Sequence, residues 1–449
     1  MKTRPDSRKW GDKRISDKKG RPSITILTQY YPPEPGAASI RLQAMAQEFL
    51  RHGYDVQVVT AFPHHLGYRD RRYAGKFLSV ETDGPIPVIR TWVFTAPSGT
   101  FWRRLINYFS FVCSSLFGLW RLPASDYLLV ESPPLFLGIA AYLYGRIRRV
   151  PYILSVSDLW PASAVALGLV KNRSAIRLSE NLEHFLYRHA YRVSAVTEGI
   201  RDAIRATGLV EPTHVLFAPN GVDPTRFTVE TPDEGLVRRL DPAHHRIFLY
   251  PGTLGYAQGL EVLLDAAERL SDRPDIVFLL VGDGPVREEL AAEARRRGLR
   301  RVIFDGLQPL ERMPHYFALA RAVIVPLRRH PLFAGARPSK AFPAWAAGVP
   351  VIFSGEGEMA TVVGESGAGV TVPPGDGAAL AEAVRRYADL DAAERERQAA
   401  NARRFVREQY SWESIMNRWL SGLGPESPSE RRLDAARAGR TEEGPTSAS

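Results

Sequence analysis

The sequence predicts an α/β protein with two doubly wound parallel sheets that follow one another along the chain. Short β-branched runs alternate with amphipathic stretches of helical period, a pattern typical of parallel strands joined by crossover helices. This rhythm stops in a stretch rich in proline and charge at residues 231–245 and then begins again. A length of 449 residues also fits two domains of ordinary size.

Each expected strand is a short apolar run that ends in a polar or glycine-containing segment. In the first half these runs occupy residues 24–29, 55–60, 127–131, 152–156 and 193–196. In the second half they occupy residues 246–252, 276–282, 302–304, 322–327 and 350–353. Doubly wound sheets bind their ligands at the carboxyl ends of the strands, so functional residues are expected in the loops that follow these runs.

The same pattern predicts the domain boundaries. We expect a basic tail at residues 1–22, a first domain at 23–230, a second domain at 245–408, a helix at 410–423 and a tail at 424–449. The last helix has one apolar face, formed by Trp412, Ile415, Met416, Trp419, Leu420 and Leu423. Such a face must pack against another element, whereas both tails are expected to be disordered.

Composition places the chain among soluble globular proteins, with 45% apolar and 24% charged residues. Its single cysteine, Cys113, excludes an internal disulfide and a four-cysteine metal site, which favours a reducing, cytoplasmic compartment. Residues 1–22 hold nine Lys or Arg and three Asp, and so carry more than half of the formal net charge of +10. The rest is mildly basic, so nucleic acid is not an expected partner, and the N-terminal stretch lacks the apolar core of a secretory signal.

The longest apolar run, residues 105–120, is shorter than the ~20 residues that a membrane-spanning helix needs, and it contains polar groups. We therefore do not expect it to cross a bilayer. Two interpretations stay open: a partly buried helix of the first domain, or an aromatic surface with flanking arginines that lies in a membrane interface. The residues that favour the second are Trp102, Arg103, Arg104, Phe109 and Phe111.

The most informative loop follows the strand at 322–327 and reads GARPSKAFPAWAAGVP at residues 335–350. Arg337, Ser339 and Lys340 stand at the expected start of a helix, where two cations and free amide groups favour a diphosphate. Small residues around them would let such an anion approach closely. The alternative is a solvated basic loop.

Three other turns contain small residues after strands. Gly36 and Ala37 precede a helix, and an anion could approach their backbone. Thr253 and Gln258 are the polar side chains of the loop that opens the second half, and Gly282 ends the next strand. Each of these turns is a weak signal by itself, because small residues are also needed for packing and for capping helices.

Polar and aromatic side chains suited to a sugar follow strands of the first half. His64 and His65 come after the second strand, and Asp158 and Trp160 come directly after the strand at 152–156. An aspartate can accept hydrogen bonds from sugar hydroxyls, and an aromatic ring can cover a sugar face. A non-catalytic role for the paired histidines is the alternative.

Motifs for several other activities are missing. GDGPVRE at residues 282–288 has the first two glycines of a dinucleotide fingerprint but not the third, and there is no phosphate-binding P-loop. Asp389 and Asp391 form an Asp-x-Asp pair in a highly charged helical region, so a surface role is expected for them. Neither a metal site nor a bound cofactor is expected.

Taken in order, these segments resemble the family 4 retaining glycosyltransferases of the GT-B fold, closest to the bacterial branch that builds O-antigen, colanic acid and related surface polysaccharides. The resemblance runs from about Ile24 to Leu423. It is carried by QYYPPEPGAAS, SDLWPASA, PNGVD, YPGTLGYAQGLE, VGDGP, GARPSKAF and AAGVPV. Each motif is weak alone, and their order identifies the family.

The resemblance implies two Rossmann-like domains facing a cleft, with the nucleotide sugar held mainly by the second and the acceptor mainly by the first. The last helix would cross back onto the first domain. Donor binding would involve Gly36, Ala37, Thr253, Gly255, Gln258, Gly282, Ser339 and Glu358. Acceptor binding would involve His64, His65, Asp158 and Trp160. Arg337 and Lys340 would stabilise the departing diphosphate without a metal ion.

The chain departs from the family pattern in the second domain. Many members carry two glutamates that align here with Gly335 and Pro343, and the second usually contacts the nucleotide ribose, which a proline cannot do. A proline inside a helix clashes with the carbonyl four residues earlier at a cost of ~3 kcal/mol. We therefore expect this helix to start late, near Phe342, or to be distorted at its entrance. Two family cations align with Thr253 and Gln258, so their charge is expected at residues 337 and 340 instead.

The predicted function is retaining transfer of a sugar from a nucleoside diphosphate, taken as UDP, to a glycan acceptor linked to undecaprenyl diphosphate. Such an enzyme of lipopolysaccharide or exopolysaccharide synthesis would be peripheral on the inner face of the plasma membrane, with an anionic membrane surface as a further partner. The alternative is a non-catalytic or weakly catalytic sugar-nucleotide-binding subunit of a polysaccharide assembly complex, for which Pro343 is the evidence. A GT-B epimerase fits the acceptor-like loops poorly.

Overall fold

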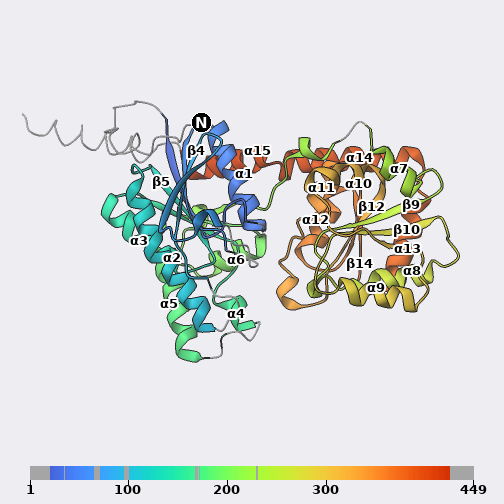
Figure 1. Cartoon of the computed structure of the whole chain (residues 1–449), viewed down its shortest axis with the longest axis horizontal. Coiled ribbons are helices and arrows are strands. Elements are labelled where there is room, and N and C mark those ends of the chain that lie inside the picture. The colour runs from blue at the N-terminus through green and yellow to red at the C-terminus, as the bar shows by residue number, and fades with distance from the viewer. Residues whose placement is uncertain are drawn as a thin grey trace, which may run out of the picture. The chain divides into compact units, whose positions relative to one another are not determined.

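The computed structural model describes residues 21–424 except 35, 65–70, 96–100, 167–169, 171 and 229–230 (Figure 1). His65 and almost all of the two expected tails lie outside these described residues. The chain forms two compact units, and each is described by itself. The first comprises Met1–Ala195, Ile204–Leu216 and Trp419–Ser449, and the second comprises Val196–Ala203 and Phe217–Arg418.

An eight-stranded sheet lies at the centre of the first unit, in the order β3-β4-β2-β1-β5-β6-β7-β8. Pairs from β4 to β7 are parallel, while β3 pairs antiparallel with β4. The strands are β1 (Ser23–Leu27), β2 (Asp55–Ala61), β3 (Leu78–Asp83), β4 (Ile86–Thr91), β5 (Tyr127–Ser132), β6 (Tyr152–Val156), β7 (Arg192–Ala195) and β8 (Val215–Phe217). The helices are α1 (Ala37–Arg51), α2 (Phe101–Arg121), α3 (Leu137–Arg148), α4 (Ala162–Ala166) and α5 (Arg173–His189), together with the end of α6 (Glu198–Ala206), whose first residues group with the second unit.

A six-stranded, all-parallel sheet lies at the centre of the second unit, in the order β11-β10-β9-β12-β13-β14. Its strands are β9 (Arg246–Pro251), β10 (Ile276–Val281), β11 (Val302–Phe304), β12 (Ala320–Pro326), β13 (Val351–Ser354) and β14 (Gly369–Val372). The helices are α7 (Glu234–Leu240), α8 (Glu261–Arg269), α9 (Arg287–Arg296), α10 (Met313–Leu319), α11 (Ala341–Ala346), α12 (Glu358–Ser366), α13 (Gly377–Ala388), α14 (Ala392–Phe405) and α15 (Trp412–Leu423). Both sheets therefore confirm the predicted fold class.

Short helical turns connect these elements. The 3-10 turns are η2 (Arg71–Tyr73), η3 (Pro212–His214), η4 (Pro224–Phe227), η5 (Tyr256–Gln258), η6 (Leu310–Arg312) and η7 (Pro331–Phe333), and a π-helical turn at Val406–Tyr410 precedes α15. In both sheets the strand order reverses beside the first strand of the unit, between β1 and β5 and between β9 and β12. These reversals are the switch points beside which doubly wound sheets bind ligands.

The apolar runs of the second sheet are continuous because both of its faces are covered by helices. Successive side chains of a strand point to opposite faces. Accordingly, Ile247 and Leu249 of β9 belong to one buried cluster, and Phe248 and Tyr250 belong to another on the other side. The strand at 246–252 could therefore be recognised from its apolar run alone.

The units divide earlier along the chain than the boundary expected at residue 230. Val222 and Phe227 are buried in one core cluster of the second unit, beside Leu236 and Leu240 of α7. Burial of these apolar side chains explains why residues 217–228 group with the second unit. Spacing of strands alone does not show on which core such a connecting segment packs.

Helix α15 begins in the second unit and ends in the first. Trp412 and Ile415 pack on Gly221, where an added Cβ would lie within 2.8 Å of both side chains. Trp419 is almost fully buried, and its indole Nε1 donates a hydrogen bond to Ser194 Oγ at 3.0 Å. The helix thus returns to the first unit, as predicted, because its apolar face has partners in both.

Helix α2 has one buried and one exposed face, and both are largely apolar. A Cβ added to Gly118 would lie 2.8 Å from Val59 Cγ1, so the helix packs closely on the sheet there. Phe111 is buried in the core, which excludes it from any exposed surface, whereas Phe109 is exposed. The side chains of Trp102 and Arg104 lie outside the described residues. Within the described residues, no helix combines the length and the apolarity needed to cross a bilayer.

Helix α11 starts late, as predicted. It begins at Ala341, so that Pro343 is its third residue and still lies in the first turn. An amide group in the first turn of a helix has no partner four residues earlier, and a proline is tolerated there. The carbonyl of Pro343 accepts a hydrogen bond from Ala347 N at 3.0 Å, and this contact closes the short helix at its C-cap.

Candidate functional site

Two loops at the carboxyl ends of β9 and β10 lie backbone against backbone. A Cβ added to Gly282 would lie 2.0 Å from the carbonyl oxygen of Gly252, and one added to Gly284 would lie 2.3 Å from the carbonyl oxygen of Leu254. No side chain fits at these distances. The φ angle of 146° at Gly282 also favours glycine. Gly282 is therefore required by the contact that shapes this end of the sheet.

Lys340 is a partly buried cation beside these loops. Its Nζ donates a hydrogen bond to Tyr250 Oη at 2.8 Å, and its Cε lies 3.4 Å from the position of a Cβ on Gly252. Tyr250 in turn donates its hydroxyl proton to the carbonyl oxygen of Thr253. Burial lowers the pKa of Lys340 to about 8, because desolvation disfavours the charged form. Among the described residues no carboxylate forms an ion pair with it.

A cavity of about 250 Å³ opens at Lys340. Gly252, Gly282, Lys340 and Pro343 line it together with Gln308. The remaining walls are apolar, namely Phe227, Pro251, Val281, Leu307, Leu310, Met313 and Phe317. The volume is somewhat below the ~300–1,000 Å³ of complete small-molecule sites, so this cavity suits one portion of a larger ligand. An apolar chamber with one unpaired cation fits a ligand that joins a flat apolar group to an anion.

Arg337 lies in a different environment, although it is only three residues from Lys340. Its side chain is 8% exposed, forms an ion pair with Glu358 and donates a hydrogen bond to Tyr410 Oη at 2.9 Å. It lines a cavity of about 880 Å³ together with Glu198, Glu365 and Glu408, and Lys340 does not line that cavity. The structure does not bring the two expected cations together in one pocket. Glu358 and Tyr410 hold Arg337 at the other cavity, and the carboxylate of Glu358 neutralises its charge.

Glu358 holds two segments of the second unit together. One carboxylate oxygen accepts a hydrogen bond from Glu198 N at 2.8 Å, and the other accepts one from Gly199 N at 3.2 Å. These amides are the first two of α6, where a helix favours negative charge. With Arg337 as a third partner, this carboxylate is fully engaged by protein groups.

The other donor-site candidates of the second unit lie around the same loops. Thr253 and Ser339 are exposed, and Gln258 ends η5. A Cβ on Gly255 would lie 2.7 Å from Gln258 Oε1, which can move. The loop between β9 and α8 therefore carries Thr253, Gly255 and Gln258 on the same side of the sheet as the Lys340 cavity.

In the first unit, His64 is fixed by neighbouring groups. Its Nδ1 lies 2.9 Å from the carbonyl oxygen of Phe62, and its Nε2 lies 3.2 Å from Gln29 Nε2. Nδ1 also lies 3.4 Å from the buried carboxylate oxygen Oε1 of Glu34, so both ring nitrogens have polar neighbours. The ring also stacks on Tyr30, with centroids 5.7 Å apart. This arrangement orients His64 at the carboxyl end of β2.

Asp158 and Trp160 lie at the same edge of the sheet, after β6. Asp158 is exposed and accepts a hydrogen bond from Ser163 Oγ at 2.9 Å. Trp160 is partly buried, and its Nε1 has no hydrogen-bond partner among the described residues. β1 and β5 lie between β2 and β6, so the strands that precede His64 and these two residues are not neighbours in the sheet. Gly36, with a φ of 146°, and Ala37 begin α1 at this edge after β1.

A buried ion pair at the switch point was not recognised from the sequence. Arg41 of α1 pairs with Glu131 at the end of β5, and the two side chains are 3% and 1% exposed. Ser157 Oγ donates to the same carboxylate oxygen at 2.7 Å. The available signal was one charged residue in an otherwise apolar stretch of helix, Arg41, and one in an apolar strand, Glu131. Buried charges are normally paired, so the two could have been expected to meet. The pair fixes α1, and hence Gly36, against the sheet.

No group of three or more His, Cys, Asp or Glu side chains within the described ranges is placed to hold a metal ion. Asp389 pairs with Arg273, with 2.8 Å between Oδ1 and a guanidinium nitrogen, and Asp391 caps α14. These contacts explain why an Asp-x-Asp pair stands at this position.

Two family models match the chain. Residues 36–221 match the glycosyl transferase 4-like domain, and residues 245–389 match the glycosyl transferases group 1. The two matched segments follow the order of the two units. Each includes the loops that carry the candidate residues of its own unit.

Relatives in other organisms are glycosyltransferases. A Bacillus subtilis glycosyltransferase named for teichuronic acid biosynthesis is 30% identical over 383 residues, which cover 81% of this chain and 88% of the relative. An Escherichia coli glycosyltransferase named for colanic acid biosynthesis is 26% identical over 314 residues, 68% of this chain and 77% of the relative. Both names refer to bacterial polysaccharides.

Solved structures share the fold. The Anabaena protein HepE, solved in complex with UDP and glucose, has a TM-score of 0.65 at 19% identity, and the match covers 89% of this chain and 98% of HepE. At that identity the likeness establishes the arrangement of strands and helices but not the ligands. Together with the two family models and the relatives, it assigns the protein. The chain belongs to the group 1 glycosyltransferases with a glycosyl transferase 4-like first domain, and it is a GT-B glycosyltransferase of glycan biosynthesis.

Proposed function

We propose that this enzyme transfers a sugar, with retention of anomeric configuration, from a UDP-sugar to a lipid-linked glycan acceptor. The observation that carries the proposal is Lys340, a partly buried cation with a neutral partner, in a cavity at the carboxyl ends of β9 and β10. A cation without a carboxylate partner is available to an anionic ligand. The apolar walls suit a nucleobase and its sugar, and the HepE complex with UDP is consistent with this choice of donor.

Lys340 would stabilise the diphosphate as it leaves. Negative charge develops on the leaving oxygen, and a preorganised cation in a low-dielectric site stabilises it more strongly than the same cation in water. An anion beside Lys340 also raises its pKa above the value set by burial, so the donor itself keeps the lysine charged. The acceptor hydroxyl would attack from the face that the diphosphate leaves, and a diphosphate oxygen would take its proton. No metal ion is required for this charge balance.

Arg337 would act differently from Lys340. Because Glu358 and Tyr410 hold its guanidinium, its contribution is to fix the loop of residues 335–340 rather than to lie against the diphosphate. Ser339, Thr253, Gly255 and Gln258 would contact the donor from the same side of the sheet. Glu358 would support the site through Arg337.

The acceptor would bind to the first unit. Asp158 is exposed for sugar hydroxyls, and the indole Nε1 of Trp160 is left for a ligand oxygen among the described groups. His64 would contribute the surface of an oriented ring, and the backbone at Gly36 and Ala37 would complete this edge. The lipid part of the acceptor would lie in a membrane to which the enzyme is peripherally attached.

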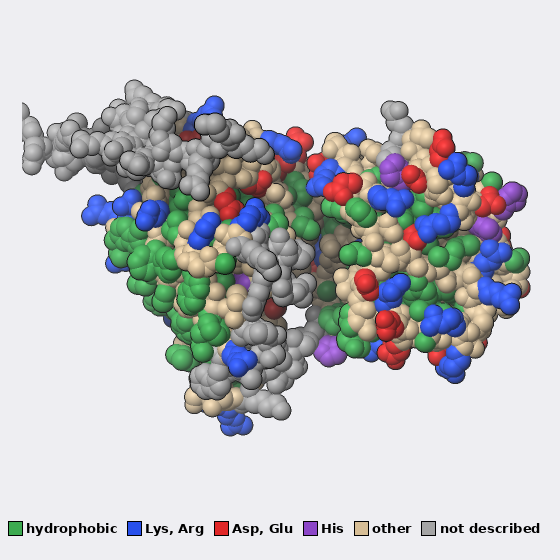
Figure 2. Space-filling model, viewed as in Figure 1, with side chains coloured by type: hydrophobic (Ala, Val, Ile, Leu, Met, Phe, Trp, Pro, Cys, Tyr) green, Lys and Arg blue, Asp and Glu red, His purple; other side chains and the backbone are tan. Residues whose placement is uncertain are grey.

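Helix α2 supports membrane attachment. Its exposed face carries Ile106, Phe109, Phe117 and Trp120, where an ordinary surface helix has polar residues. Figure 2 shows hydrophobic side chains gathered over α2 and α3, with Lys and Arg side chains nearby. Apolar residues with a cationic border are typical of helices that lie in an anionic membrane interface. An enzyme with a lipid-linked acceptor would work at the inner surface of the plasma membrane.

Lys340→Met tests the assignment, because it removes the charge and keeps an apolar chain of similar length. We expect turnover of a UDP-sugar donor with a lipid-linked acceptor to fall about 100-fold or more, as when one group that stabilises an oxyanion is removed. Lys76→Met is the matched control, since Lys76 is exposed and lies in the first unit. The anomeric configuration of the product is read by NMR.

Unchanged turnover in Lys340→Met would reject the role of Lys340. A screen of nucleotide sugars by thermal unfolding identifies the donor, because a ligand at 100 times its Kd stabilises by about 2.7 kcal/mol. Donor binding without transfer to any lipid-linked acceptor would instead favour a sugar-nucleotide-binding subunit.

A further inference from the structure

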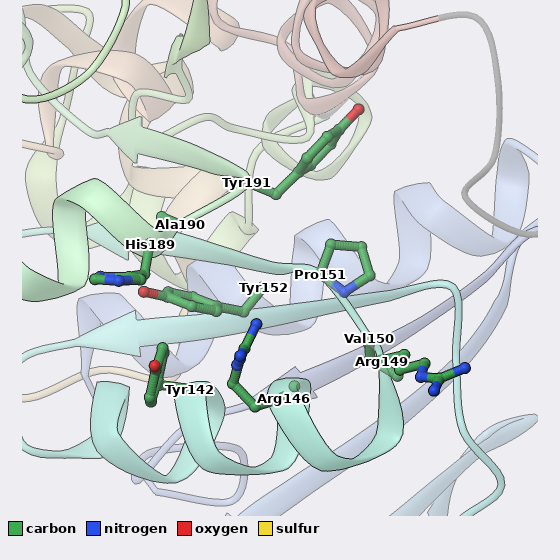
Figure 3. A pocket seen from close by; sticks show the side chains of 10 residues that line it. Tyr142, Arg146, Arg149, Val150, Pro151, Tyr152, His189, Ala190 and Tyr191 are labelled. Carbon is green, nitrogen blue, oxygen red and sulfur yellow. The ribbon is translucent and has the colours of Figure 1, made fainter. Parts of the chain in front are cut away.

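A second large cavity lies in the first unit, on the side of the sheet where β6 and β7 begin. It has a volume of about 510 Å³ and is lined by Tyr142, Gly145, Arg146, Arg149, Val150, Pro151, Tyr152, His189, Ala190 and Tyr191 (Figure 3). β6 begins at Tyr152 and β7 begins just after Tyr191, so the cavity lies at the amino ends of these strands. The proposed acceptor site lies at their carboxyl ends. This cavity therefore belongs to neither substrate site.

The lining of this cavity is cationic and contains no carboxylate. No ion pair or hydrogen bond of the Arg146 or Arg149 guanidinium is formed with other described residues. His189 Nδ1 lies 2.8 Å from the carbonyl oxygen of Phe185, so that Nδ1 donates there and Nε2 is left for a polar group of a ligand. Two unpaired guanidinium groups that border a concave surface favour an anionic ligand, and phosphate oxygens match guanidinium geometry.

The cavity suits an extended ligand rather than a lone ion. In Figure 3, Arg146 reaches from α3 toward Tyr152, whereas Arg149 lies at the other end of the cavity beside Val150. Tyr142 and His189 lie near Tyr152, so aromatic and hydrogen-bonding groups surround the inner end. A phosphate joined to a small polyhydroxyl group would contact both the guanidinium groups and the Nε2 of His189.

The same helix carries exposed apolar side chains next to the cavity. Ile147 of α3 is 64% exposed, and Leu143, one turn before it, is also exposed. They lie on the helix surface beside Arg146. Trp120 of α2 continues this surface, since its ring contacts that of Tyr144 with centroids 6.0 Å apart. The cavity thus opens beside the apolar surface of α2 and α3 shown in Figure 2.

We propose that this cavity binds the phosphoglycerol headgroup of an anionic phospholipid, while Ile147, Leu143, Phe117 and Trp120 enter the acyl region. The proposal deepens the proposed function, because it rests on attachment of the enzyme to the membrane that holds its acceptor. The charge complementarity selects a phosphate-bearing lipid. The neighbouring apolar side chains select a lipid in a bilayer over a water-soluble phosphate.

Arg146→Gln with Arg149→Gln tests the cavity by sedimentation with phosphatidylcholine vesicles that contain phosphatidylglycerol. Each Arg near an anionic surface contributes on the order of 1 kcal/mol, so the double variant is expected to bind these vesicles roughly 10-fold or more weakly. Arg173→Gln with Arg177→Gln is the matched control, because it removes the same charge from the far end of α5, where both side chains are exposed. The control is expected to lose much less.

Vesicles in which oleate supplies the same surface charge separate a phosphate site from general attraction. The proposal expects the intact protein to prefer phosphatidylglycerol, and this preference to vanish in the Arg146/Arg149 variant. Equal losses in both double variants, or no preference between the two anionic vesicles, would overturn it.

A second experiment replaces the vesicles by a soluble ligand, sn-glycerol 3-phosphate, and measures its binding by calorimetry. Binding that requires Arg146 and Arg149, without vesicle binding, would replace the lipid by a soluble phosphate ester and so overturn the membrane source. Phe117→Ser with Ile147→Ser is expected to abolish vesicle binding and leave the soluble ligand bound. A changed oligomeric state in that variant would identify a second copy of the chain as the occupant of the apolar surface and reject the lipid.

Transfer to a water-soluble acceptor separates this proposal from the proposed function. The Arg146/Arg149 variant is expected to keep its turnover with such an acceptor. Loss of vesicle binding together with unchanged turnover supports both proposals, whereas phosphatidylglycerol-specific binding by a protein that transfers no sugar supports only the headgroup site.

Discussion

At the scale of single residues, a small difference in position separates two cations with different properties. Arg337 and Lys340 are three residues apart in the loop that leads into α11, yet Arg337 contacts a carboxylate and Lys340 contacts a phenol. A paired guanidinium adds little net charge to a site. The partly buried ammonium group of Lys340, whose partner is neutral, keeps its charge only below a lowered pKa, so its charge depends on pH near neutrality.

The lowered pKa of Lys340 predicts two opposite pH dependences. The folded protein releases this proton near pH 8, whereas the unfolded chain holds it to about 10.5. Between these values the unfolded state binds more protons, so the free energy of unfolding rises with pH by up to about 3 kcal/mol. Over the same range the affinity for a UDP-sugar falls, because the cation is lost.

Denaturant unfolding and donor titrations at pH 7 to 10 measure the two trends. Lys340→Met is the reference, since it removes this titration and leaves all others in place. The intact protein and Lys340→Met should therefore differ in how the free energy of unfolding and the donor affinity change with pH. A donor affinity whose pH dependence is the same in both proteins would contradict the assignment.

At the scale of elements, close backbone contacts decide the form of the candidate site. The loops after β9 and β10 can lie together only because Gly282 and Gly284 lack a Cβ. Helix α2 likewise reaches the sheet through Gly118, which leaves its remaining apolar residues on the exposed face. In both cases a missing side chain determines which surface is left for a ligand or a membrane.

Gly282→Ala is expected to destabilise the protein and to weaken donor binding. The added Cβ would overlap the Gly252 carbonyl, and a φ of 146° is strained for alanine, so the loops must separate. Overpacking of this kind costs about 1–3 kcal/mol, and the Lys340 cavity would change shape with it.

Gly364→Ala is the control for this change, because nothing lies within 4 Å of its added Cβ in the exposed part of α12. It should be neutral or stabilising by up to about 1 kcal/mol. Chemical denaturation and calorimetric titration of the donor measure both variants. Equal stability and affinity in the two would show that the loop contact is unimportant.

At the scale of the whole molecule, the chain does not finish one unit before it begins the other. It leaves the first unit at Ala195, returns for Ile204–Leu216, and ends there again from Trp419. Helix α15 supplies apolar side chains to both units, with Trp412 in the second and Trp419 in the first. A substitution in this helix can therefore destabilise either unit, depending on which of its residues is changed.

Trp419→Ala is expected to destabilise the first unit by about 3–5 kcal/mol, because it leaves a large cavity beside Phe49 and removes the hydrogen bond to Ser194. Trp412→Ala is the matched change for the second unit, where this ring covers Gly221. Hydrogen exchange by segment measures each unit separately, which matters because a protein of two units need not unfold in one step. The same pattern of lost protection in both variants would refute this division of the helix.

The local sequence pattern was sufficient for much of the fold. Alternating apolar runs and amphipathic stretches predicted two doubly wound sheets, and the late start of α11 followed from Pro343 alone. These features depend on residues close together in the chain. The same is true of the apolar face of α15, which required a partner whatever that partner proved to be.

How the site residues are used depends on packing between segments that are distant in the sequence. The local pattern shows that Arg337 and Lys340 follow a strand. It does not show that Arg337 forms an ion pair with Glu358, or that Lys340 donates a hydrogen bond to Tyr250. It determined that residues 105–120 are apolar, but not which of them remain exposed after Gly118 meets the sheet. Desolvation and the choice of ionic partner depend on segments distant in the sequence, and these are set by the packing of the whole unit.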